Sequence, residues 1–211
     1  MKRLTYSICL LIISIIGLQA QNNADAERII DNILSQVRTS AISTAFTLKV
    51  SEKNAVNSQS GSGTFIMKGS KFVLEMDNMK AWFDGKTQWA YLAESKEVSI
   101  TEPTESELAD TNPMAILSKY RSKCVIRFSK TKSTQNNVVE MLPKDKKSEI
   151  VRIEIQSAKS TGHPVSIKMI AKNGTTTLLT LSNYQKNVKV SDDIFVFNKA
   201  KYKGVTMNDL R

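Results

Sequence analysis

Short stretches of alternating apolar and polar residues recur along most of the chain, and they constrain its fold more than any other feature. Residues 46–50 are an example, because Phe46, Leu48 and Val50 alternate with polar residues. This period of two is typical of a strand that buries one face. The same reading predicts strands at 64–68, 72–76, 81–83, 89–91, 98–100, 124–129, 137–142, 149–156, 165–171 and 175–184.

The segments between these strands are short and rich in turn residues. Asp84-Gly85 and Asn173-Gly174 are dipeptides that favour tight hairpins, because both tolerate a positive φ. A Ser/Asn/Gly-rich segment, 57–63, is interpreted as a further turn. Short turns join neighbouring strands in antiparallel order, so the sequence predicts an antiparallel sheet curled around one core.

Two segments have helical spacing instead. The first runs from about Asp25 to Arg38. The second, Pro103 to Tyr120, predicts one or two short helices with a clear start at Asn112-Pro113, where proline suits the first helical position. Met114, Leu117 and Tyr120 share one side of the second helix. The first helix has an apolar stripe made of Ile29, Ile30, Ile33, Leu34 and Val37.

Residues 1–20 have the pattern of a cleavable secretory signal. Two basic residues precede an uncharged, mostly apolar run at 4–18, and Ala20 supplies a small residue for cleavage. The run is about 15 residues long, which is short for a bilayer span of about 20. We therefore expect export to the periplasm and a single mature domain, 21–211, that diffuses freely. An uncleaved membrane anchor is the alternative.

Composition narrows the possible partners. Cys124 is the only cysteine of the expected mature chain, so it forms no intramolecular disulfide, and its apolar neighbours indicate a buried position. The formal net charge is +10, and a basic surface favours anionic partners. We expect no nucleic-acid partner, because the export signal argues against one and no aromatic-plus-basic stacking motif occurs.

Few residues indicate catalysis or metal binding. His163 is the only histidine and lies between glycine and proline, a turn context, and there is no Gly-x-Ser-x-Gly elbow. One histidine and Cys124 leave too few ligands for zinc or copper. Gly85-Lys86-Thr87 resembles the end of a phosphate loop, but the earlier glycine is missing. We expect no enzyme and no cofactor; a hydrolase that uses His163 is an alternative.

The apolar segments are soft and rich in methionine, a side chain that adapts to irregular apolar ligands. Phe65, Met67, Phe72, Leu74 and Met76 fall on adjacent predicted strands, where they would line one concave face. Ordinary core packing is the competing interpretation for most methionines.

Residues 84–91, Asp-Gly-Lys-Thr-Gln-Trp-Ala-Tyr, are similar to the Asp-Gly-Lys-Thr-x-Trp-x-Tyr hairpin of the LolA family, the periplasmic lipoprotein carriers of Gram-negative bacteria. Three further stretches resemble the family in the same order along nearly all of the mature chain. They are Phe-Thr-Leu-Lys-Val at 46–50, Asn-Pro-Met-Ala-Ile-Leu at 112–117, and Phe-Val-Phe at 195–197 followed by Gly-Val-Thr-Met-Asn-Asp at 204–209.

The resemblance implies a mainly β fold with helices (α+β), an incomplete antiparallel β-barrel of about 10–11 strands under a helical lid. It also implies a non-enzymatic carrier of acylated lipoproteins from an inner-membrane release complex to an outer-membrane acceptor; we expect a monomer. The family commonly has Lys-Arg-Pro after its second strand, and that arginine helps to hold the lid closed. Here Gly69 occupies the arginine position, with Lys68 and Lys71 as the nearest substitutes.

We expect acyl chains to bind in a hydrophobic cavity that the lid fills when the protein is empty. One 16-carbon chain represents about 12 kcal/mol of transfer free energy, so displacement of the lid would moderate the affinity. A lipid- or lipoprotein-sensing interaction domain of the envelope is the alternative function. The expected cavity and lid residues are Ile29, Ile33, Val37, Phe46, Leu48, Phe65, Met67, Phe72, Leu74, Met76, Trp89, Tyr91, Met114 and Leu117.

Overall fold

The computed structural model describes residues 23–53, 55, 58–104, 107–108 and 113–211. The predicted signal, 1–20, lies outside these residues. The strands are β1 (Ile42–Ser51), β2 (Gln59–Lys68), β3 (Lys71–Met76), β4 (Met79–Phe83), β5 (Gln88–Leu92), β6 (Glu97–Thr101), β7 (Cys124–Phe128), β8 (Asn136–Pro143), β9 (Ile150–Ala158), β10 (Pro164–Ala171), β11 (Thr176–Lys186) and β12 (Thr206–Asp209).

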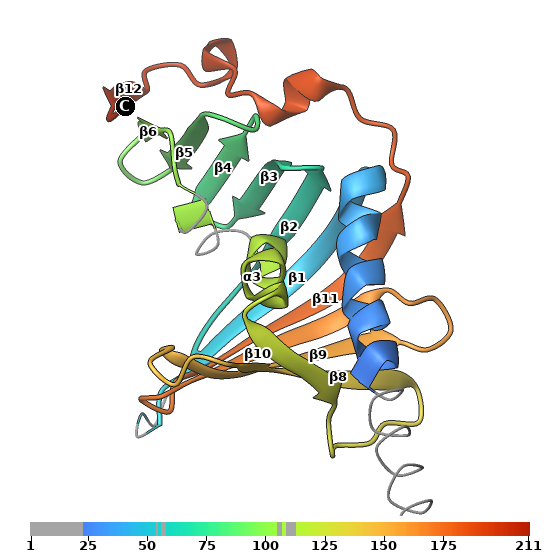
Figure 1. Ribbon diagram of the computed structural model, residues 1–211. Helices are drawn as coiled ribbons and strands as arrows, with labels where there is room; N and C mark the ends of the chain where they lie inside the picture. The colour runs from blue at the N-terminus through green and yellow to red at the C-terminus, as the bar shows by residue number, and fades with distance from the viewer. Residues whose placement is uncertain (1–22, 54, 56–57, 105–106, 109–112) are drawn as a thin grey trace, which may run out of the picture.

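All these strands belong to one twelve-stranded sheet with the order β12-β6-β5-β4-β3-β2-β1-β11-β10-β9-β8-β7 (Figure 1). Neighbouring strands are antiparallel except β12, which runs parallel to β6. The curled sheet does not close, because β12 and β7, at the two ends of this order, do not pair with each other. The predicted incomplete antiparallel barrel with helices is confirmed.

Two strand assignments differ from the sequence-based expectation. The segment 57–63 is not wholly a turn, because β2 already begins at Gln59 and its glycines pair with β1. β12 is absent from the predicted strands, because its apolar alternation is limited to Val205 and Met207 and its partner is β6, about a hundred residues earlier in the chain. Glycine is common in turns, but a long neighbouring strand can recruit it into a ladder.

The N-terminal helix and α3 lie over the concave face of the sheet (Figure 1). Residues 23–39 are helical, and α3 (Pro113–Arg121) follows β6. No helix in the described ranges combines the length and the apolar character that a membrane span needs. The helices and the concave face share the inner cluster, whose buried members are Ala26, Ile30, Ile33, Leu34, Val37, Ile42, Phe46, Phe65, Met67, Phe72, Leu74, Ala81, Phe83, Leu117, Cys124, Ile126, Val139, Met141, Ile153, Ile155, Ile167 and Leu179.

The convex face of β3 to β6 carries a second cluster. The chain after β11 crosses it through two short 3₁₀ helices, η1 (Asp192–Phe195) and η2 (Lys199–Lys201), before it reaches β12 (Figure 1). Rings from this segment pack against the strands, and Phe195 is fully buried. We call this set the outer cluster; its buried members are Val73, Trp82, Val98, Ile100, Phe195 and Phe197.

Candidate functional site: an apolar cavity beneath two helices

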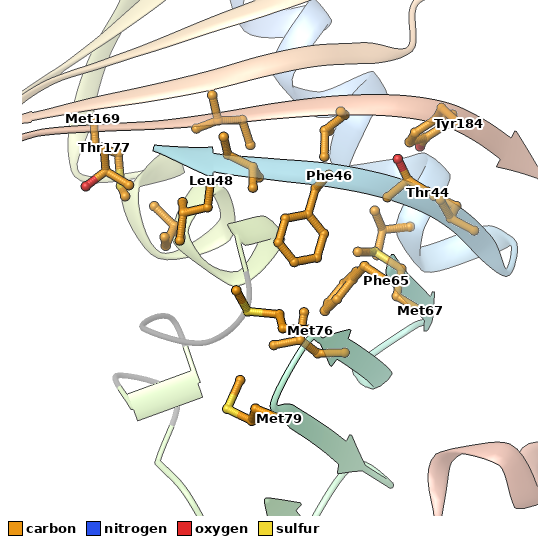
Figure 2. A pocket seen from close by; sticks show the side chains of 17 residues that line it. Thr44, Phe46, Leu48, Phe65, Met67, Met76, Met79, Met169, Thr177 and Tyr184 are labelled. Atoms are coloured by element: carbon orange, nitrogen blue, oxygen red, sulfur yellow. The ribbon is translucent and has the colours of Figure 1, made fainter. Parts of the chain in front are cut away.

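A cavity of about 250 Å³ lies between the concave face and the helices (Figure 2). Figure 2 shows side chains from β1, β2, β3 and β4 gathered around it, with four methionines among those that it labels. None of the described residues on its wall is charged. The lining residues are Val37, Ile42, Thr44, Phe46, Leu48, Phe65, Met67, Leu74, Met76, Met79, Ile116, Ile167, Met169, Thr177, Leu179, Leu181 and Tyr184.

Two polar groups on the wall are engaged elsewhere. The Thr44 hydroxyl donates to the carbonyl oxygen of Ser182 at 2.9 Å, so it is turned into the backbone of β11. The Tyr184 hydroxyl donates to Gln36 Oε1 at 3.3 Å, and burial raises the pKa of Tyr184 to about 12. The wall is therefore neutral at physiological pH and suited to an apolar ligand rather than an ionic one.

Two glycines of β2 leave space on the cavity side of the sheet. Gly63 pairs with Phe46, and a Cβ at Gly63 would collide with the backbone of Glu75. A Cβ at Gly61 would meet one neighbour, Met76 Cε, at 2.8 Å. Because the end of a methionine side chain is flexible, Gly61 is a position where added bulk can enter the cavity without moving the backbone.

Half of the residues predicted for the cavity and lid line the cavity itself: Val37, Phe46, Leu48, Phe65, Met67, Leu74 and Met76. Ile33, Phe72 and Leu117 are fully buried within the inner cluster, and Ile29 packs against it. These four support the wall without forming it. The side chain of Met114 lies outside the described part of the chain.

Trp89 and Tyr91 are placed elsewhere, so the expectation that they line the cavity is corrected. Both pack against the outer cluster, and Trp89 pairs across β4–β5 with Trp82. Alternation places neighbouring residues of a strand on opposite faces, but it does not say which face is concave. In β5 the side facing the cavity carries Ala90.

The far wall of the cavity was missed by sequence reasoning. Ile167 and Met169 of β10, with Leu179 and Leu181 of β11, line it beside the predicted residues of β1. Their alternation in the predicted strands 165–171 and 175–184 does indicate that they share one face of each strand. What the sequence did not show was that β11 pairs with β1, which brings these residues to the cavity.

One arginine joins the two helices over the cavity. Arg121, at the end of α3, donates from Nε to Asp31 Oδ1 at 2.6 Å and from Nη2 to Asp31 Oδ2 at 2.9 Å. Nη2 also donates to Glu27 Oε2 at 3.1 Å. The hydrogen bond from Arg121 lowers the pKa of Asp31. This two-pronged geometry holds the helices together more firmly than a single lysine contact would.

A second polar contact joins the N-terminal helix to the far wall. Gln36 accepts the Tyr184 hydrogen bond, and its Nε2 donates to the carbonyl oxygen of Gly162 at 3.4 Å. Beside it, the His163 ring lies 4.6 Å from the Tyr184 ring, between centroids. His163 thus packs in the β9–β10 turn, and burial lowers its pKa.

The turn at Gly69 holds the same helix in a different way from the arginine of the family. Gly69 has a φ of +61°, and its N–H donates to the Val37 carbonyl oxygen at 3.1 Å. Lys68 and Lys71 do not replace the arginine on the lid. Both form ion pairs with Asp192 of η1, at 2.8 and 2.6 Å.

No cluster of metal-ligating side chains occurs within the residues that the structure describes. Cys124 is buried, and desolvation raises the pKa of its thiol, which makes it a poor nucleophile. The described side chains around the cavity therefore form an apolar container.

Residues 16–203 match the family model described as outer membrane lipoprotein carrier protein LolA. No curated protein matches the chain. An uncharacterized conserved protein from Thermus thermophilus shares the fold with a TM-score of 0.58, 10% identity, and coverage of 88% of this chain and 99% of that one.

Two further solved structures are less similar. The LolA superfamily protein NE2245 from Nitrosomonas europaea has a TM-score of 0.45 at 11% identity, covering 82% of this chain and 97% of that chain. The Pseudomonas aeruginosa MucA/MucB complex has a TM-score of 0.42 at 11% identity, with 83% and 62% covered.

Proposed function

The chain belongs to the LolA family of outer membrane lipoprotein carrier proteins, and we propose that it carries lipoproteins across the periplasm. The acyl chains of the cargo bind in the cavity beneath the helices. An inner-membrane release complex supplies the cargo, and an outer-membrane acceptor takes it. The observation that supports this proposal is a cavity of about 250 Å³ with no charged side chain among the described residues of its wall.

The small size of the cavity suits a carrier that must release its cargo. A dry apolar cavity of about 150 Å³ holds a molecule the size of benzene, so about 250 Å³ takes only part of a long acyl chain. The rest of the chain enters by displacing the helix residues that close the cavity, Val37 and Ile116. The affinity is then the difference between two apolar burials, each of about 0.8 kcal/mol per methylene.

The contacts that keep the helices in place are reversible. Arg121 is paired with carboxylates whose side chains are about half exposed, Asp31 at 53% and Glu27 at 45%. Such pairs contribute about 1 kcal/mol or less. The helices therefore stay closed over an empty cavity, but acyl burial is strong enough to displace them.

No catalytic step belongs to this function. His163, the residue of the hydrolase alternative, packs on Tyr184 in a turn. We expect His163→Ala to leave acyl binding and transfer unchanged. An esterase activity that the wild type has and this variant lacks would contradict the carrier function.

The cavity is tested by filling it. Gly61→Leu places a branched side chain against Met76 Cε, inside the cavity. We expect the affinity for a fluorescent 16-carbon fatty acid to fall by about tenfold or more, because the volume available to the chain shrinks. Ser62→Leu is the matched control, since Ser62 is the next residue of β2 and is exposed. Equal affinity in both variants would place the acyl chain elsewhere.

A transfer experiment distinguishes a carrier from a protein that only binds lipoproteins, because a carrier must release its cargo to a membrane. The purified protein is loaded with a fluorescent triacylated lipoprotein and mixed with outer-membrane vesicles. A carrier transfers the fluorescence to the vesicles, whereas a sensor of lipoproteins retains it. Native mass spectrometry of the protein from its own periplasm gives a second check, because a carrier co-purifies with lipoprotein or lipid.

A further inference from the structure

The two edges of the sheet differ in whether another strand covers them. At one end the chain covers its own edge, because β12 pairs with β6. At the other end β7 pairs with β8 alone, and no other strand of the described residues lies beside it. An uncovered strand offers unpaired N–H and C=O groups to another chain.

The hydrogen bonds next to β7 show which groups are free. The Ser129 N–H donates to the Val138 carbonyl oxygen at 2.8 Å, and the Lys144 N–H donates to the Lys123 carbonyl oxygen at 2.9 Å. In an antiparallel pair, alternate residues bond to the partner strand. The odd-numbered residues of this strand therefore bond to β8, and the even-numbered ones direct their main-chain groups away from it.

The free main-chain groups belong to residues next to the inner cluster. Ile126 is 1% exposed within the inner cluster, and Phe128 packs against it. On the other face of β7, Val125 is 45% exposed. A strand added beside β7 would thus place one row of side chains toward the core and the other toward solvent.

The segment that forms this end of the sheet carries most of the net positive charge. Residues 119–159 hold eleven Lys and Arg against four Asp and Glu, a net charge of +7 in a chain of +10. Arg127 and Arg152 share the buried carboxylate of Glu140. Lys123 and Lys130 lie at the two ends of β7, are exposed, and pair with no acidic group among the described side chains.

This charge decides between possible occupants of the edge. A second copy would bring its own lysines to the same edge, and like charges across a strand pair repel. An acidic extended segment finds complementary charge at both ends of the strand.

We propose that β7 is a docking edge that binds an extended, acidic segment of a partner protein as an added strand. Its main-chain groups bond to Ile126 and Phe128, and its acidic side chains lie near Lys123 and Lys130. This interaction is separate from acyl binding in the cavity, so each can fail while the other holds.

The test uses the whole mature protein and a defined probe, a fluorescent nine-residue peptide in which glutamate alternates with valine. A second peptide has the same side chains but carries N-methyl groups on alternate residues, so that it cannot donate to a strand edge. We expect the N-methylated peptide to bind about tenfold or more weakly in anisotropy titrations. Equal binding of the two peptides, or binding of neither, would overturn the proposal.

A charge reversal locates the site. In Lys123→Glu/Lys130→Glu the affinity for the unmodified peptide should fall by about tenfold, and binding to the wild type should weaken as salt rises. Lys199→Glu/Lys201→Glu makes the same change in net charge on exposed residues of η2, and we expect less than about a twofold effect. Equal losses in both variants would show a non-specific charge effect and refute a site at β7, as would concentration-dependent dimerisation of the wild type.

Discussion

The inner and outer clusters lie on opposite faces of the same sheet but are built differently. In the outer cluster, Trp82, Phe197 and Tyr202 have ring centroids 5.1 to 5.5 Å apart, and Tyr91 lies 4.8 Å from Tyr202. The inner cluster borders a cavity of about 250 Å³ whose wall combines methionine and aliphatic side chains with Phe46, Phe65 and Tyr184. Aromatic rings close the outer face, whereas the mixed wall leaves space on the inner face.

With acyl binding in the cavity as proposed, the difference assigns stability to the outer face and binding to the inner face. A face sealed by the protein's own C-terminal segment contributes packing that no ligand disturbs. A face with empty volume gives up some packing, and a ligand can recover it. Alternation of side chains along the strands thus separates the closely packed face from the face that borders the cavity.

The largest expected effect is in the outer cluster. Phe195→Ala should lower the free energy of unfolding by about 3–5 kcal/mol, because Phe195 is fully buried. Urea denaturation followed by tryptophan fluorescence measures this, since the only two tryptophans, Trp82 and Trp89, both pack there. Met79→Ala, on the cavity wall, should cost about 1 kcal/mol, because Met79 already borders empty space. Equal losses of unfolding free energy in the two variants would contradict the difference in packing between the clusters.

Substitution of Gly69, in the turn between β2 and β3, should have the next largest effect on the free energy of unfolding. Gly69 has a φ of +61° and no neighbour within 4 Å of an added Cβ. Gly69→Ala should therefore cost about 1–2 kcal/mol from the backbone alone. Gly69→Asn should cost less, because asparagine tolerates this conformation. Chemical denaturation of the two variants gives the comparison, and a larger loss for asparagine would contradict a backbone origin.

The contact between the helices should affect stability and binding in opposite directions. Arg121→Ala removes its bonds to Asp31 and Glu27, so the empty protein should lose about 1 kcal/mol of stability. The same loss makes lid displacement easier, and the affinity for the 16-carbon probe should rise up to about fivefold. Arg28→Ala is the control, because Arg28 pairs with Asp25 on the same helix. Weaker probe binding in Arg121→Ala would mean that the arginine contacts the ligand.

Lowering the pH should cause the smallest change in stability. Hydrogen bonds from Lys68 and Lys71 lower the pKa of Asp192 from 3.8 to about 2. The unfolded carboxyl binds its proton first, so this stabilisation is complete above pH 3.8 and is lost as the pH falls toward 2. Asp192→Asn should flatten the acid dependence of tryptophan fluorescence at the outer cluster. Acid dependence that persists in this variant would point to another group.

Asp31 provides the counterpart on the inner side, because the hydrogen bond from Arg121 lowers its pKa too. Protonation of Asp31 at low pH weakens its contact with Arg121, so the probe affinity should rise as the pH falls. Asp31→Asn should remove this acid dependence and leave the tryptophan signal unchanged. A change in both signals would show that the clusters are coupled.

Sequence reasoning identified most strands but misjudged their surroundings. Period-two alternation located Phe46 and Leu48 correctly on β1, because local sterics and burial act within a few residues. It interpreted the glycines of 57–63 as a turn, whereas Gly61 and Gly63 belong to β2 and make room for neighbours across the sheet. That use of glycine depends on Phe46 and Met76, so it is not readable locally.

The sequence by itself determined most of the strands, the helical segments and the family, since these depend on alternation, helical spacing and ordered motifs. Tertiary structure alone decided which face of each strand is concave, and it placed Trp89 and Tyr91 in the outer cluster. It also brought Arg121 to Asp31 and left β7 uncovered by any other described strand. The physical reason is that a strand pattern specifies two faces, whereas the curl of the sheet and the pairing of distant strands decide what each face meets.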